Sequence, residues 1–230
     1  MALILQIETA TDVCSVSIAE DGVTIAIEFD SRGRNHASIL LPSIDNCIRK
    51  SGITLNELDA VAVSMGPGSF TGLRIGVATA KGICYALDKP LIAVNTMKSM
   101  ASHFRKNHAL DVLICPMIDA RRKEVYTALF DQNLNELFDT RAMILSEDSL
   151  QEWTSGHPIA FLGSGAKKCG AILNSTSNCL FFSDFQISSE GMNAICMDSY
   201  ANKRFEDVAV FEPFYLKDFY VPSNKQQKAD

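Results

Sequence analysis

The chain has 230 residues, 47% of them hydrophobic and 21% charged, enough for one large folded unit or two small ones. Lys and Arg number 21 against 27 Asp and Glu, and the net charge of −6 disfavours tight nucleic-acid binding by this chain alone. Seven cysteines include no C-x-x-C pair, and no apolar run is long enough to span a membrane. These features exclude a zinc ribbon and a membrane partner, and they predict a soluble cytoplasmic protein.

The first half of the chain alternates short apolar runs, turn residues and amphipathic stretches, which is the pattern of an α/β unit. Strands are expected at residues 2–8, 13–20, 23–29, 59–65 and 91–94. Helices are expected at residues 38–50, 71–87 and 98–106. Three hairpin-linked strands followed by helix, strand and helix predict a mixed sheet with helices on its faces.

The second half repeats this order of elements. Strands are expected at residues 112–118, 124–130, 136–145 and 159–162, a weaker helix at 146–153, and a helical run from 165. Equivalent features recur at an offset of about 110 residues with a shortened second copy, so we interpret the chain as a tandem duplication. The expected division is an N-terminal subdomain at 1–108, a C-terminal subdomain at 109–217 and a polar tail at 218–230, with a cleft between the subdomains.

The most informative stretch is the glycine-rich turn at residues 66–76, Gly-Pro-Gly-Ser-Phe-Thr-Gly-Leu-Arg-Ile-Gly. It joins a predicted buried strand to a predicted helix, where backbone N–H groups can face an anion or a partner. A Walker A loop needs Lys and then Ser or Thr after its last glycine, and a Rossmann fingerprint needs glycine at Thr71. Neither phosphate-binding motif fits. A second G-x-G, formed by Gly163 and Gly165, occupies the equivalent place in the second half.

The helix after this turn has more apolar surface than one core face requires. Its core stripe consists of Leu73, Val77, Ala80, Cys84 and Leu87. Its other faces carry small or aliphatic residues, namely Gly72, Ile75, Gly76, Ala78, Thr79, Gly82, Ile83 and Ala86. In the preceding helix Ile39 points away from an expected core stripe of Ala37, Leu40, Leu41, Ile44 and Ile48. We interpret the two helices as a subunit interface, and the alternative is that another layer of the same chain covers them.

Two acids, Glu8 and Asp119, end equivalent strands and are expected to face the cleft. In a phosphotransferase such a pair holds a metal-bound nucleotide or positions water. The alternative is that each carboxylate only accepts hydrogen bonds from the turn that follows it. The four histidines include no pair spaced for one helix face, and no nucleophile elbow is evident. The residues therefore predict a nucleotide-cleft fold with little catalytic machinery.

Taken together, these residues resemble the TsaB (YeaZ) family. The resemblance rests on Ile7-Glu8-Thr9-Ala10-Thr11, His36-Ala37-Ser38 with Leu40-Leu41-Pro42, residues 66–76, Asp119-Ala120-Arg121 with Glu124-Val125-Tyr126, and Pro213-Phe214-Tyr215-Leu216. It covers nearly the whole chain, to about Lys217. It implies the acetate/sugar kinase–Hsp70–actin (ASKHA) fold with two RNase H-like subdomains, the second one reduced, which agrees with the duplication.

The resemblance also implies a function. Members are non-catalytic subunits that bind the paralogous TsaD and, with the ATPase TsaE, support transfer of a threonylcarbamoyl group to the adenosine next to the anticodon of tRNAs reading A-starting codons. Their two N-terminal helices pair with TsaD or with a second copy, so a TsaD heterodimer and a homodimer of the chain alone are expected, with tRNA contacted only indirectly. The implied interface residues are Ile39, Gly72, Ile75, Gly76, Ala78, Thr79, Gly82, Ile83 and Ala86.

In TsaD the strand corresponding to residues 91–94 is followed by Asn-His-x-x-x-His, whose histidines bind the catalytic metal. In this chain Asn95 is followed by Thr96 and, four residues later, by Met100. Neither side chain replaces imidazole at a hard metal centre. We therefore expect no catalytic residue, no metal and no cofactor in this chain.

The competing hypothesis is a stand-alone ASKHA-type ATPase or phosphotransferase that uses Glu8 and Asp119. A vestigial nucleotide cleft, if retained, would be formed by Glu8, Thr9, Asp119, Gly163 and Gly165. The chain departs from the family in having Glu8 where Asp is usual and Lys217 where Arg is common, which removes a bidentate fork. The sequence leaves open whether Arg121, Arg122 and Lys123 touch tRNA within a complex.

Overall fold

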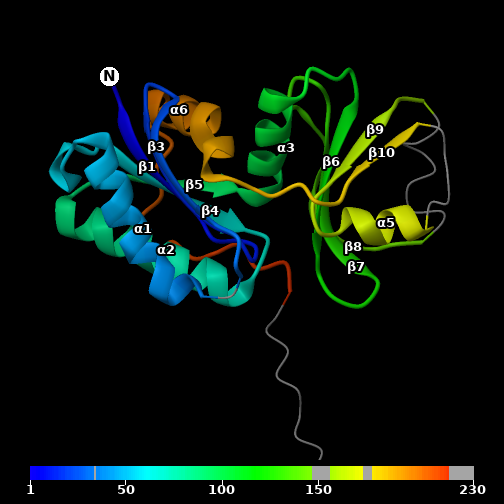
Figure 1. The fold of residues 1–230 in the computed structure, drawn as a ribbon, viewed down its shortest axis with the longest axis horizontal. Coiled ribbons are helices and arrows are strands. Elements are labelled where there is room, and N and C mark those ends of the chain that lie inside the picture. Colours follow the sequence, from blue (N-terminus) through cyan, green and yellow to red (C-terminus); the bar gives the residue numbers. More distant parts are fainter. Residues whose placement is uncertain (34, 147–155, 173–177, 218–230) are drawn as a thin grey trace, which may run out of the picture.

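The computed structural model describes residues 1–33, 35–146, 156–172 and 178–217, and its strands form two five-stranded sheets that lie next to each other (Figure 1). The polar tail expected at 218–230 and most of the helix expected at 146–153 lie outside the described residues. In the part of the chain that is described, no helix combines the length and the apolar character needed to cross a bilayer.

The first sheet has the strand order β3-β2-β1-β4-β5. Its strands are β1 (Leu3–Glu8), β2 (Cys14–Glu20), β3 (Val23–Asp30), β4 (Ala60–Gly66) and β5 (Leu91–Asn95). β1 pairs antiparallel with β2 and parallel with β4, so the three hairpin-linked strands and the crossover strands meet at β1. This mixed sheet confirms the architecture expected from the first half of the sequence.

The second sheet has the strand order β10-β9-β6-β7-β8. Its strands are β6 (Leu113–Asp119), β7 (Glu124–Phe130), β8 (Glu136–Ile144), β9 (Ile159–Leu162) and β10 (Cys179–Phe182). When counted from β8, the order and the strand directions repeat those of the first sheet. The duplication is confirmed. β10 was not predicted, although it is no shorter than β9, which was predicted.

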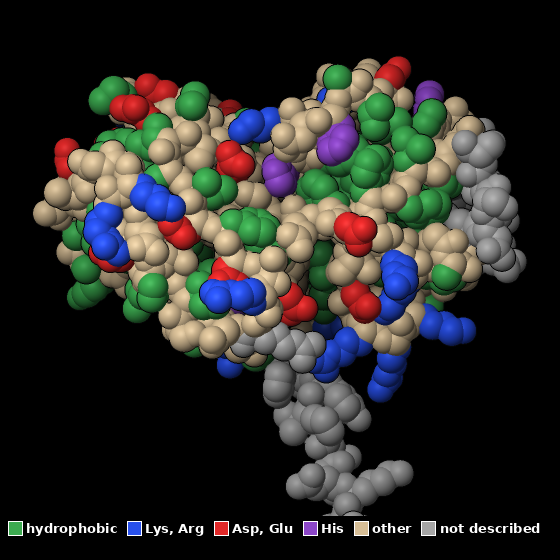
Figure 2. Space-filling model, viewed as in Figure 1, with side chains coloured by type: hydrophobic (Ala, Val, Ile, Leu, Met, Phe, Trp, Pro, Cys, Tyr) green, Lys and Arg blue, Asp and Glu red, His purple; other side chains and the backbone are tan. Residues whose placement is uncertain are grey.

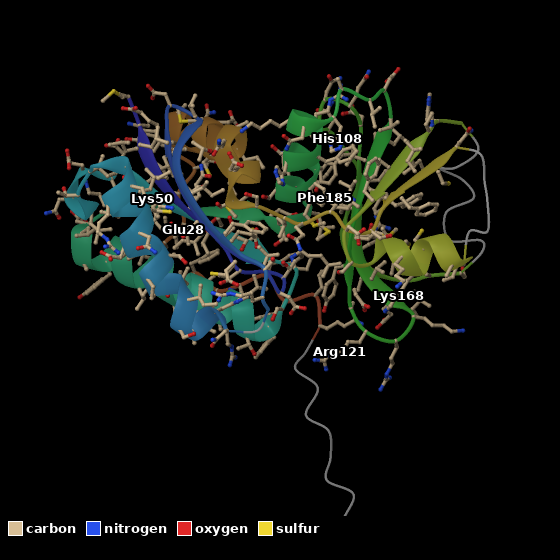
Figure 3. All side chains as sticks on the ribbon, in the orientation of Figure 1. Glu28, Lys50, His108, Arg121, Lys168 and Phe185 are labelled. Atoms are coloured by element: carbon tan, nitrogen blue, oxygen red, sulfur yellow. The ribbon has the colours of Figure 1, made fainter. Side chains whose placement is uncertain are left out.

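Helices α1 (His36–Ser51) and α2 (Phe70–Leu87) cover one face of the first sheet, with the single-turn η1 (Leu55–Glu57) between them in sequence (Figure 1). At the edge of the sheet the Lys50 ammonium of α1 lies 2.6 Å from the Glu28 carboxylate of β3 (Figure 3). α2 begins after Ser69, whose hydroxyl accepts a hydrogen bond from the Gly72 N–H at 3.3 Å. Ser69 is thus an N-cap that starts the helix at the glycine-rich turn.

The remaining helices are exchanged between the halves of the chain. α3 (Thr96–Asn107) packs Met97, Met100 and Phe104 against the second sheet, although it follows the first sheet in sequence. Conversely, η3 (Ser189–Met192) and α6 (Asn193–Ala201) cover the free face of the first sheet, where Met192 and Cys196 join its core. The short α5 (Ala166–Ile172) covers the other face of the second sheet. The division expected at residues 108/109 therefore lies between the strands of the two sheets. It does not separate the helices in the same way, because each sheet is covered on one face by a helix from the other half of the chain.

Candidate functional site

The glycine-rich turn packs against the loop between β1 and β2 of the same chain. A Cβ atom on Gly72 would lie 2.1 Å from the Thr9 carbonyl oxygen, and one on Gly68 would lie 2.2 Å from that of Ala10. The Ser69 N–H donates to the Ala10 carbonyl at 2.6 Å. These glycines are therefore needed for close approach of two backbone segments within the chain, which explains the motif without a bound anion.

Gly76 is covered in the same way, since its Cβ would lie 2.2 Å from the Thr9 hydroxyl oxygen. Both Gly72 and Gly76 are buried. The expectation that these two residues lie on a free face of α2 is wrong, because the β1–β2 loop already occupies the space above them. The expected core residues Leu73, Val77, Ala80 and Cys84 are buried as predicted.

A C-terminal segment, residues 206–217, covers a second flank of α2, and we call it the strap. The Lys81 ammonium donates to the carbonyl oxygens of Ala209 and Phe211 at 3.3 and 2.9 Å. The Arg74 guanidinium donates to the Tyr215 hydroxyl at 3.3 Å, and the Tyr215 ring lies 4.8 Å from that of Phe70. On this flank α2 is therefore covered by another segment of the same chain, which was the alternative to a subunit interface. From the sequence, residues 213–216 were identified only as an apolar motif, and their packing against α2 was not predicted.

Part of α2 stays uncovered by the described residues, namely a narrow row that we call the open stripe: Ala78, Gly82, Tyr85 and Ala86. All four are exposed, Tyr85 by 86%, and a Cβ on Gly82 would meet no atom within 4 Å. On α2 the stripe is bordered by the half-buried residues Ile75, Thr79 and Ile83, and Ile39 of α1 is half-buried too. Of the residues expected at an interface, Ala78, Gly82 and Ala86 thus lie on this open surface and Ile75, Thr79 and Ile83 beside it.

On the neighbouring α1, Leu40 and Ile44 are buried as expected, whereas Ala37 is exposed and Leu41 is exposed by 61%. The assignment of Leu41 to the core is wrong, because His36, Ser43 and Cys47 face the sheet in its place. The exposed Leu41 adds apolar surface on α1, which covers the same face of the first sheet as α2 (Figure 1).

A cleft of about 1600 Å³ separates the two sheets, and the surface is hollowed between them (Figure 2). Of the five residues expected there, Asp119 and Gly163 line it, but Glu8, Thr9 and Gly165 do not. The Gly163 N–H donates to the Phe182 carbonyl and the Gly165 N–H to the Met117 carbonyl, each at 3.0 Å. The second G-x-G therefore has these two donors engaged within the chain and does not offer them to a phosphate.

The two acids do not form a catalytic pair. Glu8 is completely buried, and its Oε1 accepts the Ala10 N–H at 2.7 Å. Burial raises the pKa of Glu8 to about 7, against the lowering effect of hydrogen bonds from Ala10, Ser64 and Thr9. Asp119 Oδ1 accepts the Arg121 N–H at 2.7 Å and the Lys168 ammonium at 2.5 Å. The expectation that Glu8 faces the cleft is wrong; both acids accept hydrogen bonds from the turns that follow them.

A pH dependence of stability follows from the burial of Glu8. Its folded pKa of about 7 exceeds the ordinary value of 4.5, so the folded state binds more protons between these values. The associated stability is present below the unfolded pKa and is lost as the pH rises through the folded pKa. Wild type loses this stability between pH 5 and pH 8, whereas Glu8→Gln does not. The free energy of unfolding of Glu8→Gln minus that of wild type should therefore be higher near pH 8 than near pH 5 by about 2 kcal/mol. Urea unfolding of both proteins at both pH values measures this change. An equal difference between variant and wild type at pH 5 and pH 8 would contradict the prediction.

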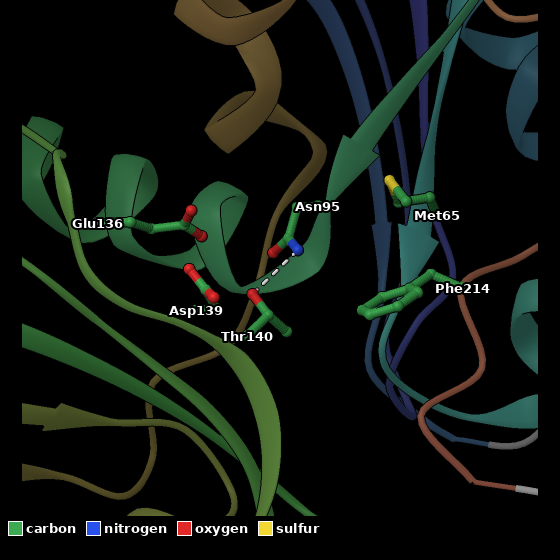
Figure 4. A pocket seen from close by; sticks show the side chains of 6 residues that line it. All are labelled: Met65, Asn95, Glu136, Asp139, Thr140 and Phe214. Atoms are coloured by element: carbon green, nitrogen blue, oxygen red, sulfur yellow. Dashed lines mark hydrogen bonds between the residues drawn. The ribbon is translucent and has the colours of Figure 1, made fainter.

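A smaller hollow of about 280 Å³ lies where β5 and α3 meet β8 (Figure 4). Asn95 ends β5 and caps α3, because its Oδ1 accepts the Met97 and Lys98 N–H groups at 2.8 and 3.2 Å. Its Nδ2 donates to the Thr140 hydroxyl of β8 at 3.0 Å. Asn95 is therefore occupied in joining the two sheets.

The comparisons with known proteins agree with one another. A family model described as "TsaD: tRNA N6-adenosine threonylcarbamoyltransferase" matches residues 30–218. The tRNA threonylcarbamoyladenosine biosynthesis protein TsaB of Escherichia coli (strain K12) is 33% identical over 228 residues, which cover 93% of this chain and 94% of that protein. This chain belongs to the TsaB family. The family expected from the sequence motifs is thereby confirmed.

Solved structures place the TsaB chain in the ASKHA fold. YeaZ from Pseudomonas aeruginosa is similar with a TM-score of 0.83 at 22% identity, covering 94% of this chain and all of that one. The activator of the 2-hydroxyisocaproyl-CoA dehydratase from Clostridium difficile has a TM-score of 0.53 at 9% identity, covering 89% and 98% of the two chains. With the two repeated sheets, these likenesses confirm the fold class of two RNase H-like subdomains.

A tRNA N6-adenosine threonylcarbamoyltransferase from Staphylococcus saprophyticus is 36% identical over 132 residues, half of this chain and 38% of that protein. TsaB and the transferase are thus related in sequence. In this TsaB chain Thr96 and Met100 are buried in α3. In the part of the chain that the structure describes, no group of three or more His, Cys, Asp or Glu side chains is arranged to hold a metal ion.

Proposed function

We propose that this chain is the non-catalytic TsaB subunit that binds and supports TsaD, with TsaE, in threonylcarbamoyl transfer to the adenosine next to the anticodon of tRNAs reading A-starting codons. The observation that carries the proposal is the open stripe. Ala78, Gly82 and Ala86 leave a groove of small residues on a helix that is already packed on its other sides. Such a surface fits another helix at short distance.

The sequence relationship with the transferase supports TsaD as the occupant of the stripe. We infer that the related transferase presents an equivalent pair of helices and that the two proteins pair around a pseudo-twofold axis. A homodimer of this chain would use the same surface in the absence of TsaD. Tyr85, with its ring almost fully exposed, is the residue on the stripe with the most area to bury.

The competing ATPase or phosphotransferase hypothesis finds no support in the site. Glu8 is buried and shares no open space with Asp119, and Asp119 is paired with Lys168. The two G-x-G turns are filled by other parts of the chain. These observations support a reaction centre on the partner and a supporting role for this chain.

Light scattering on a sizing column tests the proposal directly. The chain is run alone, with its cognate TsaD, and with an unrelated protein of similar size and charge. We expect a new heteromeric peak with TsaD that replaces the free species, and none with the unrelated protein. A mixture that elutes as two independent proteins at micromolar concentration would refute the proposed function.

A further inference from the structure

The loop between β6 and β7 and the adjacent α5 concentrate positive charge on an otherwise acidic chain. Arg121, Arg122 and Lys123 of the loop and Lys167 of α5 are all exposed, and we call these four residues the basic rim. Lys and Arg side chains gather along the lower edge of the second sheet in Figure 2, and Figure 3 shows Arg121 and Lys168 at this edge. The net charge of −6 makes such a concentration unexpected.

The loop is held in a conformation that costs energy. Arg121 and Arg122 both adopt the left-handed region, with φ of 69° and 50°, where residues other than glycine are disfavoured. Two consecutive left-handed positions in a hairpin are usually taken by Asn and Gly. Arginine at both positions therefore requires a compensating reason, and strained backbone of this kind clusters at functional sites.

Neighbouring groups hold the loop in place. The Lys168 ammonium donates to the Arg122 carbonyl at 2.7 Å and to Asp119 Oδ1 at 2.5 Å. Asp119 Oδ1 also accepts the Arg121 N–H, and the Glu124 N–H donates to the Arg121 carbonyl at 3.1 Å. Both arginine side chains are thus presented outwards on a braced backbone, which lowers the entropy cost of binding a ligand.

In the described part of the chain the rim has no internal counter-charge. The two acids beside it are already paired, Asp119 with Lys168 and Glu124 with Lys217. Among the described residues, no carboxylate lies within ion-pair distance of any member of the basic rim. Arg32, Lys50, Lys106 and Arg204, by contrast, each have an acidic partner. The rim is therefore the part of the described surface where unneutralised cations are held together.

We propose that the basic rim binds the sugar–phosphate backbone of RNA, so that this chain touches the tRNA directly when its partner acts on it. The proposal rests on the proposed function, from which the identity of the RNA follows. No residue of the open stripe lines the cleft that Arg121 and Arg122 border, so partner and RNA occupy different surfaces. Four cations on an acidic chain give weak binding alone and stronger binding within a complex.

The test compares three forms of the protein in a fluorescence anisotropy titration with a labelled tRNA transcript, each with and without TsaD. They are wild type, a rim variant with Arg121→Gln, Arg122→Gln, Lys123→Gln and Lys167→Gln, and a control with Arg32→Gln, Lys98→Gln, Lys106→Gln and Arg204→Gln. The control removes the same charge elsewhere. Thermal melts and light scattering establish that each variant folds and binds TsaD.

We expect the rim variant to bind tRNA at least tenfold more weakly at low salt, with a slope of log K against log salt shallower by about 3, and the control to change less than twofold. Equal weakening of rim and control variants would overturn the proposal, because only net charge would then matter. Unchanged binding by the rim variant would overturn it too. If no TsaD complex forms, the proposed function fails, while titration of the chain alone still decides whether the rim binds RNA.

Discussion

Gly72→Ala is expected to destabilise the fold by about 3 kcal/mol, the upper end of the usual cost of overpacking, because the neighbouring atom is rigid backbone. The new Cβ would lie 2.1 Å from the Thr9 carbonyl oxygen, which belongs to the backbone and has no rotamer to adopt. Relief requires movement of the β1–β2 loop, and this loop is tied to the turn by the hydrogen bond from Ser69 to Ala10. Urea unfolding at neutral pH measures the loss, and a thermal melt should show a midpoint lower by about 10 °C.

The matched control is Gly82→Ala, the same substitution ten residues later on the same helix. Here the Cβ enters open space, so the gain in helix propensity should stabilise the chain by up to about 1 kcal/mol. Opposite signs for the two variants would show that the glycine motif serves close packing within the chain. A Gly72→Ala variant as stable as wild type would show that the β1–β2 loop does not pack as described.

Gly82→Asp is expected to weaken the complex with TsaD by about 100-fold or more, since burying an unpaired carboxylate in an apolar interface costs several kcal/mol. The carboxylate would stand in the middle of the open stripe, between Ala78 and Ala86. The isolated chain should stay folded, because the side chain enters solvent and aspartate is at least as good as glycine within a helix. Titration calorimetry with TsaD gives the affinity, and a melt gives the stability.

Ala194→Asp provides the control for charge. Ala194 is exposed on α6, which covers the opposite face of the first sheet from α1 and α2. This variant should bind TsaD as wild type does. Wild-type affinity of Gly82→Asp would exclude the open stripe as the interface, and equal weakening by both variants would show that the effect is not local. The homodimer, measured without TsaD, should respond to Gly82→Asp alone.

The sequence predicted elements best where their periodicity was strong and local. The strands at residues 124–130 and 159–162 have the predicted bounds, and α2 begins one residue before the prediction. α6 was missed because its buried residues, Asn193, Cys196 and Ser199, include two polar ones and therefore show no apolar period. The hydrogen bond from Asn193 to the Thr24 hydroxyl, at 2.9 Å, explains how one of them is accommodated.

By itself, the sequence determined the duplicated α/β architecture, the family and the excess of apolar surface on α2, because each of these is written in local patterns. Only the tertiary structure decided which of those surfaces stays free. Gly72 and Gly76 are as small as Gly82, yet the β1–β2 loop buries the first two, and the strap takes up Arg74 and Lys81. The tertiary structure also decided that Glu8 is buried, so that it does not share the cleft with Asp119. These outcomes depend on contacts between segments that are far apart in the chain, and a local periodic pattern does not predict such contacts.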